Sequence, residues 1–261
     1  MFRSLHIAAT GMAAQEAQLD AISNNLANVN TTGFKKVRAD FQDLLYETMR
    51  APGTATNGTN FSPTGLQVGS GARIVATTRQ FSQGALLQTG NPLDLAIEGN
   101  GFFSIQQPDG TIGYTRAGNF KSDAEGRIVN SEGMPLDPPI TIPPDATNIS
   151  IGADGTVSAS TKTSSQPVQL GQIQLASFIN PAGLNSIGHN LYIQTAASGE
   201  PQVGVPGNDG RGTMLQGTVE HANVEVVEEM IGLIAAQRNY EINSKVVTAA
   251  DEMLRNATQM R

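Results

Sequence analysis

The sequence has no cysteine and no tryptophan, and aromatic residues make up only 5% of its 261 residues. The absence of cysteine excludes disulfides and thiolate chemistry. Basic residues are also few: 16 Lys and Arg face 23 Asp and Glu, for a net charge of −7, which argues against nucleic acid as the main partner. Glycine is abundant, with 28 residues, and this composition is typical of β-structure with many turns.

Two targeting signals are missing as well. The first residues lead directly into a pattern too polar for the apolar core of a signal peptide. The most apolar helical patterns are interrupted by charges, so membrane insertion is not expected. We therefore expect that any export from the cytoplasm uses a signal that is not cleaved.

No arrangement of residues predicts catalysis. The three histidines (His6, His189 and His221) lie in separate segments without metal-ligand spacing. Gly99-Asn100-Gly101 resembles the start of a dinucleotide-binding loop, but Ser104 and a strand-like run follow it, so the match fails. The sequence predicts no enzyme, no catalytic or metal-binding residues and no cofactor.

Helical periodicity marks both ends of the chain. Apolar residues in 220–261 form two rows, which requires packing on two sides. Residues 5–29 carry a heptad pattern, which Gly33 should end as a left-handed cap. We expect the two ends to pair as a coiled coil and the second face of the C-terminal helix to pack on other copies; two amphipathic helices flanking an ordinary globular core remain an alternative. The predicted coiled-coil and assembly residues are Leu5, Met12, Leu19, Ile22, Leu26, Val227, Ile231, Ile234, Ile242, Val246 and Met253.

Two glycines inside these helices are costly, at about 1 kcal/mol each. Gly11 and Gly232 therefore predict the close approach of a neighbouring backbone, and the alternative is that both are tolerated imperfections of the helices.

Between the helices, Phe41, Leu44, Leu45 and Met49 have helical spacing and predict a second helical run. A polar segment at 51–60 follows, either a disordered linker or an arm ordered by neighbours. Alternation over 66–80 then predicts a strand.

The middle of the chain predicts β-structure. Short apolar runs alternate with turn pairs such as Asp109-Gly110, Glu125-Gly126, Glu132-Gly133 and Asp154-Gly155. Prolines on both sides of Ile140–Ile142 predict an edge strand. The predicted class is α+β, with paired terminal helices, an extended linker arm and a central all-β domain. The expected parts are a helical domain (1–33 with 222–261), a linker and arm region (34–72 with 204–221) and a β-rich outer domain (73–203).

Motifs along the whole chain resemble one family. Residues 23–35 read SNNLANVNTTGFK, residues 93–103 read LDLAIEGNGFF, and AAQRNYE follows near the C-terminus. Together and in this order they resemble the bacterial flagellar rod, hook and hook–filament junction family. The residues carrying the terminal motifs are Asn24, Asn25, Ala27, Asn28, Gly33, Phe34, Lys35, Gln237, Arg238 and Tyr240.

Within the family, the chain resembles distal rod subunits most, with the proximal rod paralogue as the nearest rival. It is too short to carry the additional outer domain of a hook protein. The resemblance to the segment that distinguishes the stiff distal rod rests on Tyr46, Pro52, Gly53, Pro63 and Gly65.

The resemblance implies a structural subunit of a helical tube in the periplasm-spanning distal rod of the basal body. It implies a rigid drive shaft that transmits torque and forms the export channel. The implied partners are further copies, other rod proteins below, the hook protein above, the peptidoglycan and outer-membrane ring bushings, and the flagellar type III export apparatus. A secreted monomeric β binding module is the alternative from another class. A cell-wall hydrolase would need a carboxylate pair in a cleft, which the sequence does not predict.

Overall fold

The computed structural model describes residues 2–53, 55–57, 60–61, 63–161 and 167–259. Contacts divide the chain into two compact units. The helical unit comprises Met1–Leu26, Val37–Thr78 and Glu225–Arg261, and the β unit comprises Ala27–Lys36 and Arg79–Val224. The three-part division expected from the sequence stays a prediction.

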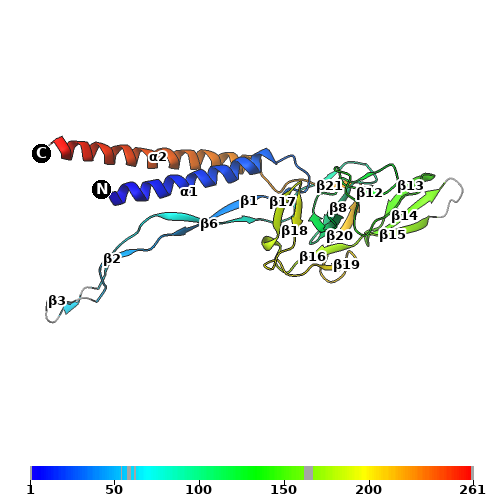
Figure 1. Cartoon of the computed structure of the whole chain (residues 1–261), viewed down its shortest axis with the longest axis horizontal. Coiled ribbons are helices and arrows are strands. Elements are labelled where there is room, and N and C mark those ends of the chain that lie inside the picture. The colour runs from blue at the N-terminus through cyan, green and yellow to red at the C-terminus, as the bar shows by residue number, and fades with distance from the viewer. Residues whose placement is uncertain (1, 54, 58–59, 62, 162–166, 260–261) are drawn as a thin grey trace. The chain divides into compact units, whose positions relative to one another are not determined.

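Helix α1 (Phe2–Ala27) and helix α2 (Val226–Gln259) lie side by side in the helical unit (Figure 1). The predicted pairing of the two chain ends is therefore confirmed, as is the α+β class, because the remaining described elements are mostly antiparallel strands. Among the described helices, none combines the length and the apolar character needed to cross a membrane.

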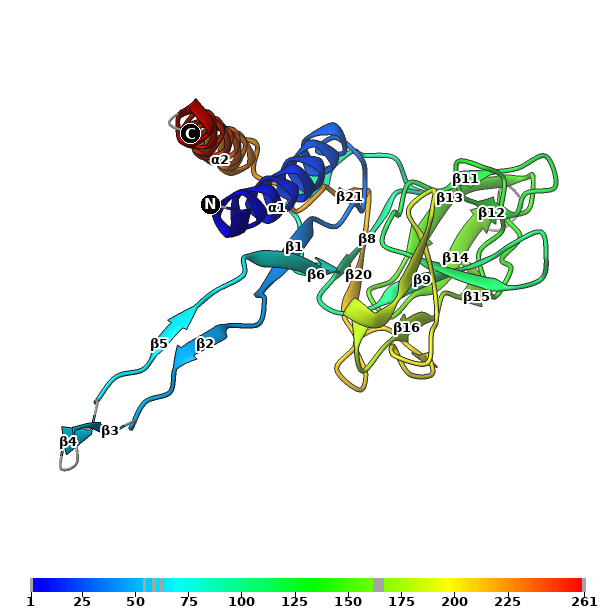
Figure 2. The same cartoon turned by 60° about the vertical axis from the view of Figure 1, so that its left-hand side comes forward.

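The predicted helical run around Phe41 is wrong. Residues 37–50 form strands of a long hairpin, which we call the arm, and Figure 2 shows its paired segments following one another to the tip. Phe41, Leu45 and Met49 are 42%, 91% and 60% exposed, so their helical spacing has no surface to pack on, and the antiparallel ladder satisfies the backbone instead. The arm pairs β1 (Val37–Asp43) with β6 (Ala72–Arg79), β2 (Glu47–Arg50) with β5 (Leu66–Val68), and β3 (Ala55–Asn57) with β4 (Asn60–Phe61).

A six-stranded antiparallel sheet is the largest element of the β unit. Its order is β17 (Asn185–Gly188), β18 (Leu191–Ile193), β10 (Ile112–Thr115), β9 (Phe102–Gln106), β16 (Leu175–Ser177) and β19 (Gln202–Gly204).

Smaller sheets complete the unit. They comprise β13 (Ala146–Ile151), β14 (Thr156–Thr161) and β15 (Val168–Gln172) in one sheet, and the pairs β8 (Leu95–Glu98) with β20 (Thr213–Gln216), β7 (Leu86–Gln88) with β21 (Thr218–Glu220), and β11 (Lys121–Ser122) with β12 (Ile128–Val129). A short 3₁₀ helix (η1) spans Pro181–Gly183.

Two large hydrophobic clusters fill most of the β unit. The larger gathers Leu95, Phe103, Phe120, Leu136 and other aliphatic residues. The smaller is aromatic and includes Phe102, Tyr114, Phe178, Leu184 and Tyr192. Burial of these side chains stabilises the unit, at about 1.5–3 kcal/mol for each large residue.

The predicted turns are confirmed, since Gly110, Gly126, Gly133 and Gly155 all have positive φ. The predicted edge strand at Ile140–Ile142 is wrong. Only an isolated bridge joins Thr141 to Arg127, while Ile140 and Ile142 are buried in the larger cluster, because the flanking prolines supply no N–H groups for a ladder.

Candidate assembly surfaces

The inner face of the helix pair is built from small residues. Ala8 on α1 and Ala236 and Ala250 on α2 are at most 3% exposed. A methyl group on Gly232 would lie 3.3 Å from Cδ1 of Ile22, and one on Gly11 would lie 3.0 Å from Nδ2 of Asn243. A neighbour does lie close to both glycines, but it is a side chain of the other helix. The prediction of a neighbouring backbone is therefore wrong.

The outer face of α2 carries a row of exposed aliphatic residues, which we call the α2 stripe. Its members are the six predicted assembly residues of that helix: Val227 (70% exposed), Ile231 (63%), Ile242 (57%), Met253 (53%), Ile234 (48%) and Val246 (43%). On α1, Ile22 is buried, while Leu5, Met12, Leu19 and Leu26 are half-buried. A monomer rarely leaves such a row in water, and rows of this kind are typical of interaction surfaces.

The arm positions of the rod motif lie around the β2–β5 pair. Tyr46 is 55% exposed, and its ring covers Gly69, where a Cβ would lie 3.3 Å from Cε1. A Cβ on Gly65 would meet the carbonyl oxygen of Arg50 at 2.7 Å, so only glycine fits there. Gly53 has a φ of 80°, and the prolines of the motif, Pro52 and Pro63, are exposed.

Asn25 explains the first part of the N-terminal motif. It is 1% exposed, and its amide group bonds to both backbone groups of Val37, accepting from N at 2.8 Å and donating to O at 2.9 Å. It also donates to Oε2 of Glu229 at 3.2 Å. One side chain thus joins the end of α1, the start of the arm and the first turn of α2. Asn24 and Ala27 lie on the exposed side of α1, and Asn28 is half-buried just beyond it.

The prediction that Gly33 caps α1 is wrong, because the helix ends at Ala27. Its φ of 70° serves a tight crossing in the β unit instead. Its N–H donates to the carbonyl of Glu220 at 2.8 Å, and a Cβ would lie 2.4 Å from N of Ala117. Phe34, next in the motif, packs against Ala222 and Val224.

Lys35 lies in a buried ion cluster. Its ammonium donates to Oε1 of Glu220 and to the carbonyl of Ser82, each at 2.7 Å. Nε of Arg116 donates to Oε2 of Glu220 at 2.9 Å, and the N–H of Gly84 also donates to this carboxylate, so Glu220 collects three donors. Burial lowers the pKa of Lys35; the attraction of Glu220 opposes that shift and the charge of Arg116 adds to it.

Sequence reasoning gave no role to Arg116 and Glu220. Charged side chains are almost never buried unless they are paired, so their burial can be predicted only when the partner is known. Lys35 and Glu220 are 185 residues apart in the sequence. The C-terminal motif residues Gln237, Arg238 and Tyr240 lie on exposed positions of α2.

Comparison with known proteins agrees with this architecture. Three family models match: a flagella basal body rod protein model at 5–35, a flagellar hook protein FlgE/F/G D1 domain at 96–159, and a flagellar basal body rod FlgEFG protein C-terminal model at 215–260.

The chain is 48% identical over 260 residues to the flagellar basal-body rod protein FlgG of Buchnera aphidicola subsp. Schizaphis graminum, covering 100% of both chains. The chain belongs to the FlgG family. FlgG of Borreliella burgdorferi is also 48% identical, over 100% of this chain and 99% of its own. The flagellar hook-basal body complex protein FlhP of Bacillus subtilis is 32% identical over 97% of both chains.

Membership in the FlgG family makes the chain a structural flagellar rod protein and not an enzyme. It is a component of the flagellar basal-body rod and assembles with rod or hook components.

Proposed function

We propose that the chain is a distal rod subunit that assembles with copies of itself into a rigid tube. The α2 stripe carries this proposal, because α2 buries one face on α1 and leaves six large aliphatic side chains exposed on the other. Neighbouring subunits would cover the stripe, and the paired terminal helices would form the inner wall of the tube.

In this proposal the tube is a drive shaft. It transmits motor torque to the hook, turns inside the peptidoglycan and outer-membrane ring bushings, and provides the channel through which later subunits pass. Other rod proteins lie below it and the hook protein above. Export through the flagellar type III apparatus, without a cleaved signal, brings the subunit to the periplasm-spanning rod.

The arm supplies the second element of stiffness. It has few buried side chains of its own: Leu45, Tyr46 and Met49 are all more than half exposed. Lateral contacts between neighbours would order these side chains and lock subunits against sliding.

The assembly surface is tested by Ile231→Lys and Ile242→Lys, with Thr248→Lys as control at an exposed polar position of the same helix. A buried charge costs several kcal/mol, so both stripe variants should abolish polymerisation in sedimentation and electron microscopy, while the control polymerises. Normal tubes from both stripe variants would refute this use of α2.

The place of the subunit in the flagellum is tested in a strain that lacks the gene. Distal rod function predicts non-motile cells whose basal bodies stop at a short rod stub. A complete straight rod lacking only the hook would contradict the distal assignment, and normal motility would contradict the drive-shaft function.

A further inference from the structure

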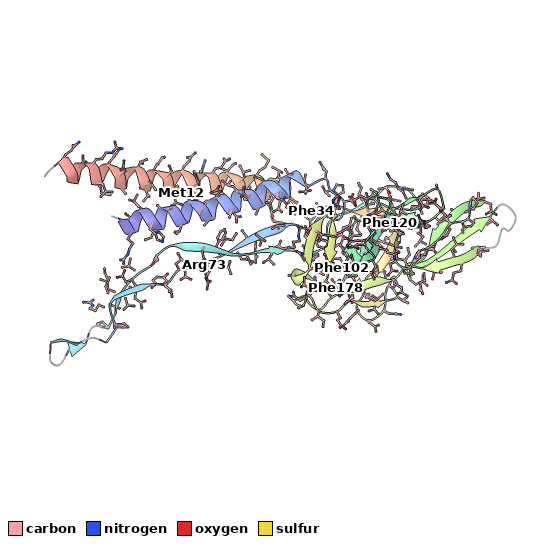
Figure 3. The ribbon with its side chains drawn as sticks, viewed as in Figure 1. Met12, Phe34, Arg73, Phe102, Phe120 and Phe178 are labelled. Atoms are coloured by element: carbon pink, nitrogen blue, oxygen red, sulfur yellow. The ribbon has the colours of Figure 1, made fainter. Side chains whose placement is uncertain are left out.

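The β unit contains a cavity of about 290 Å³ that rod assembly, as proposed above, does not explain. Its walls come from the aromatic cluster: the rings of Phe102 and Phe178 are 5.7 Å apart and those of Phe81 and Phe102 are 5.4 Å apart, and Figure 3 shows Phe102 and Phe178 close together. Glycines at 99, 101 and 210 contribute to the lining, so little side-chain bulk narrows that part of it.

Arg116 also lines this cavity and is only 4% exposed. Its Nε donates to Glu220, and its Nη1 donates to the carbonyls of Gly99 and Gly101, each at 2.8 Å. Nη2 has no hydrogen-bond partner in the described part of the chain. A guanidinium carries five N–H donors, so the two on Nη2 remain available.

The charge around Arg116 is unbalanced. Lys35 and Arg116 are two buried cations, and among the described residues Glu220 is the only carboxylate that bonds to either. Arg79 adds a third positive charge beside them, since it donates to the carbonyl of Lys35. Buried charge is stabilised by pairing, so the cluster favours one additional anion.

The lining also includes a polar group that could fix an anion. Asn100 is exposed, and its side-chain amide makes no hydrogen bond within the described ranges. The cavity therefore combines aromatic walls with donors from Arg116 and Asn100, an arrangement suited to a carboxylate on an apolar stem.

We propose that this cavity binds a carboxylate carried on an apolar stem, and that in the assembled rod an acidic side chain of a second copy occupies it. The part of this proposal that concerns the second copy rests on the proposed function. It follows from charge complementarity, because acidic residues outnumber basic ones by 23 to 16 and contacts between copies would otherwise set negative surfaces against each other.

Binding is tested on the full-length monomer, independently of polymerisation. We expect 3-phenylpropionate to bind with a dissociation constant on the order of 1 mM, typical of a fragment of this size, and to shift the NMR signals of Asn100, Gly101 and Phe178. The neutral isostere 3-phenylpropanamide should bind at least about tenfold more weakly, because charge-assisted hydrogen bonds are about twice as strong as neutral ones. Equal binding of both compounds, or no binding of either, would overturn the site.

Two variants locate the site. Asn100→Trp should block the mouth and remove binding without lowering the melting temperature, and the matched control is Asn148→Trp, an exposed asparagine of β13 outside the cavity lining. Arg116→Lys keeps the charge but lacks the fork of donors, so it should weaken binding about tenfold. Binding that survives in Asn100→Trp would refute the assignment to this cavity.

The source of the carboxylate is tested by assembly. A second copy as occupant predicts that Asn100→Trp slows polymerisation at least about tenfold, while Asn148→Trp does not. Normal polymerisation of Asn100→Trp would overturn the second-copy occupant and assign the cavity to a free carboxylate, leaving the rod function itself intact.

Discussion

The buried ion cluster predicts opposite tolerance at two paired residues. Glu220→Gln leaves the cations of Lys35 and Arg116, 0% and 4% exposed, without a counter-charge. Removing one partner of a buried pair costs about 3–5 kcal/mol. Lys35→Met removes a cation whose burial outweighs its attraction to Glu220 and leaves a one-to-one pair. It loses the hydrogen bond to Ser82, so we expect a cost of only about 1 kcal/mol.

Urea unfolding measures this difference when the signal comes from the β unit. Near-ultraviolet circular dichroism meets that condition because Tyr114 and Tyr192 are buried there, whereas Tyr46 and Tyr240 are exposed on the helical unit. Lys121→Met is the matched control. Its side chain is exposed on β11 of the β unit, and we expect a change within about 0.5 kcal/mol.

The same pair gives a pH dependence. The folded-state pKa of Lys35 is lowered below its ordinary value of 10.5, so between these two values the unfolded chain binds more protons. The stability of the native sequence should therefore rise with pH in this window. Lys35→Met lacks the group, so its cost should grow as pH rises. Measurements stay below pH 10, because at higher pH tyrosine ionisation in the unfolded chain adds a slope of the opposite sign.

A single result would refute this reasoning. If Lys35→Met destabilises the β unit as much as Glu220→Gln does at neutral pH, the lysine contributes a net favourable interaction and the desolvation argument is wrong. Equal costs at pH 7 and pH 9.5 would refute the pH dependence.

Two further predictions concern the helix pair and the turns. Gly11→Ala should lower the thermal dissociation temperature of assembled rods, because the added methyl group meets Asn243 at 3.0 Å. Overpacking costs about 1–3 kcal/mol, whereas the gain in helix propensity is only about 1 kcal/mol. Asn243→Ala should reverse the effect, and a stabilising Gly11→Ala in the native background would contradict the contact. In the Asp-Gly-Thr turns, hydrogen bonds from Thr111 lower the pKa of Asp109, and hydrogen bonds from Thr156 lower the pKa of Asp154. Their stabilisation is present above pH 3.8 and is lost as pH falls through the lowered pKa values, so the double Asn variant should lose less melting temperature between pH 6 and pH 3 than the native chain, and an equal loss would contradict it.

Local patterns predicted much of this fold. Both terminal helices, the β-structure of the middle of the chain and its Asp-Gly and Glu-Gly turns follow from periodicity and from residues that tolerate positive φ. These signals depend on neighbours in sequence, so they are visible without the structure. The apolar residues of the α2 stripe belong to the same class, since their spacing places them on one side of a helix.

Long-range pairing is what local patterns could not supply. Phe41, Leu45 and Met49 fit a helix by spacing, yet the partner strands of residues 37–50 lie beyond residue 65, and their ladder decides the conformation. The glycines illustrate the same limit. Gly33 has the positive φ of a helix cap, but that conformation is required by a crossing over Ala117, more than 80 residues away.

The roles of the buried polar groups also depend on residues far away in the sequence, and these roles bear directly on function. Asn25 and Lys35 were recognised as motif residues, but their roles depend on Val37, Glu229 and Glu220, which no spacing rule connects. Asn25 binds the first strand of the arm and the first turn of α2, and Lys35 binds the strand that precedes α2. Asn25 therefore fixes the point where the chain leaves α1 and enters the arm, and Lys35 fixes Glu220 within the β unit; an unsatisfied polar group at either place would cost about 1–3 kcal/mol. A subunit that carries torque needs defined geometry at these points, and hydrogen-bonded polar groups specify it more narrowly than apolar contacts, which tolerate sliding.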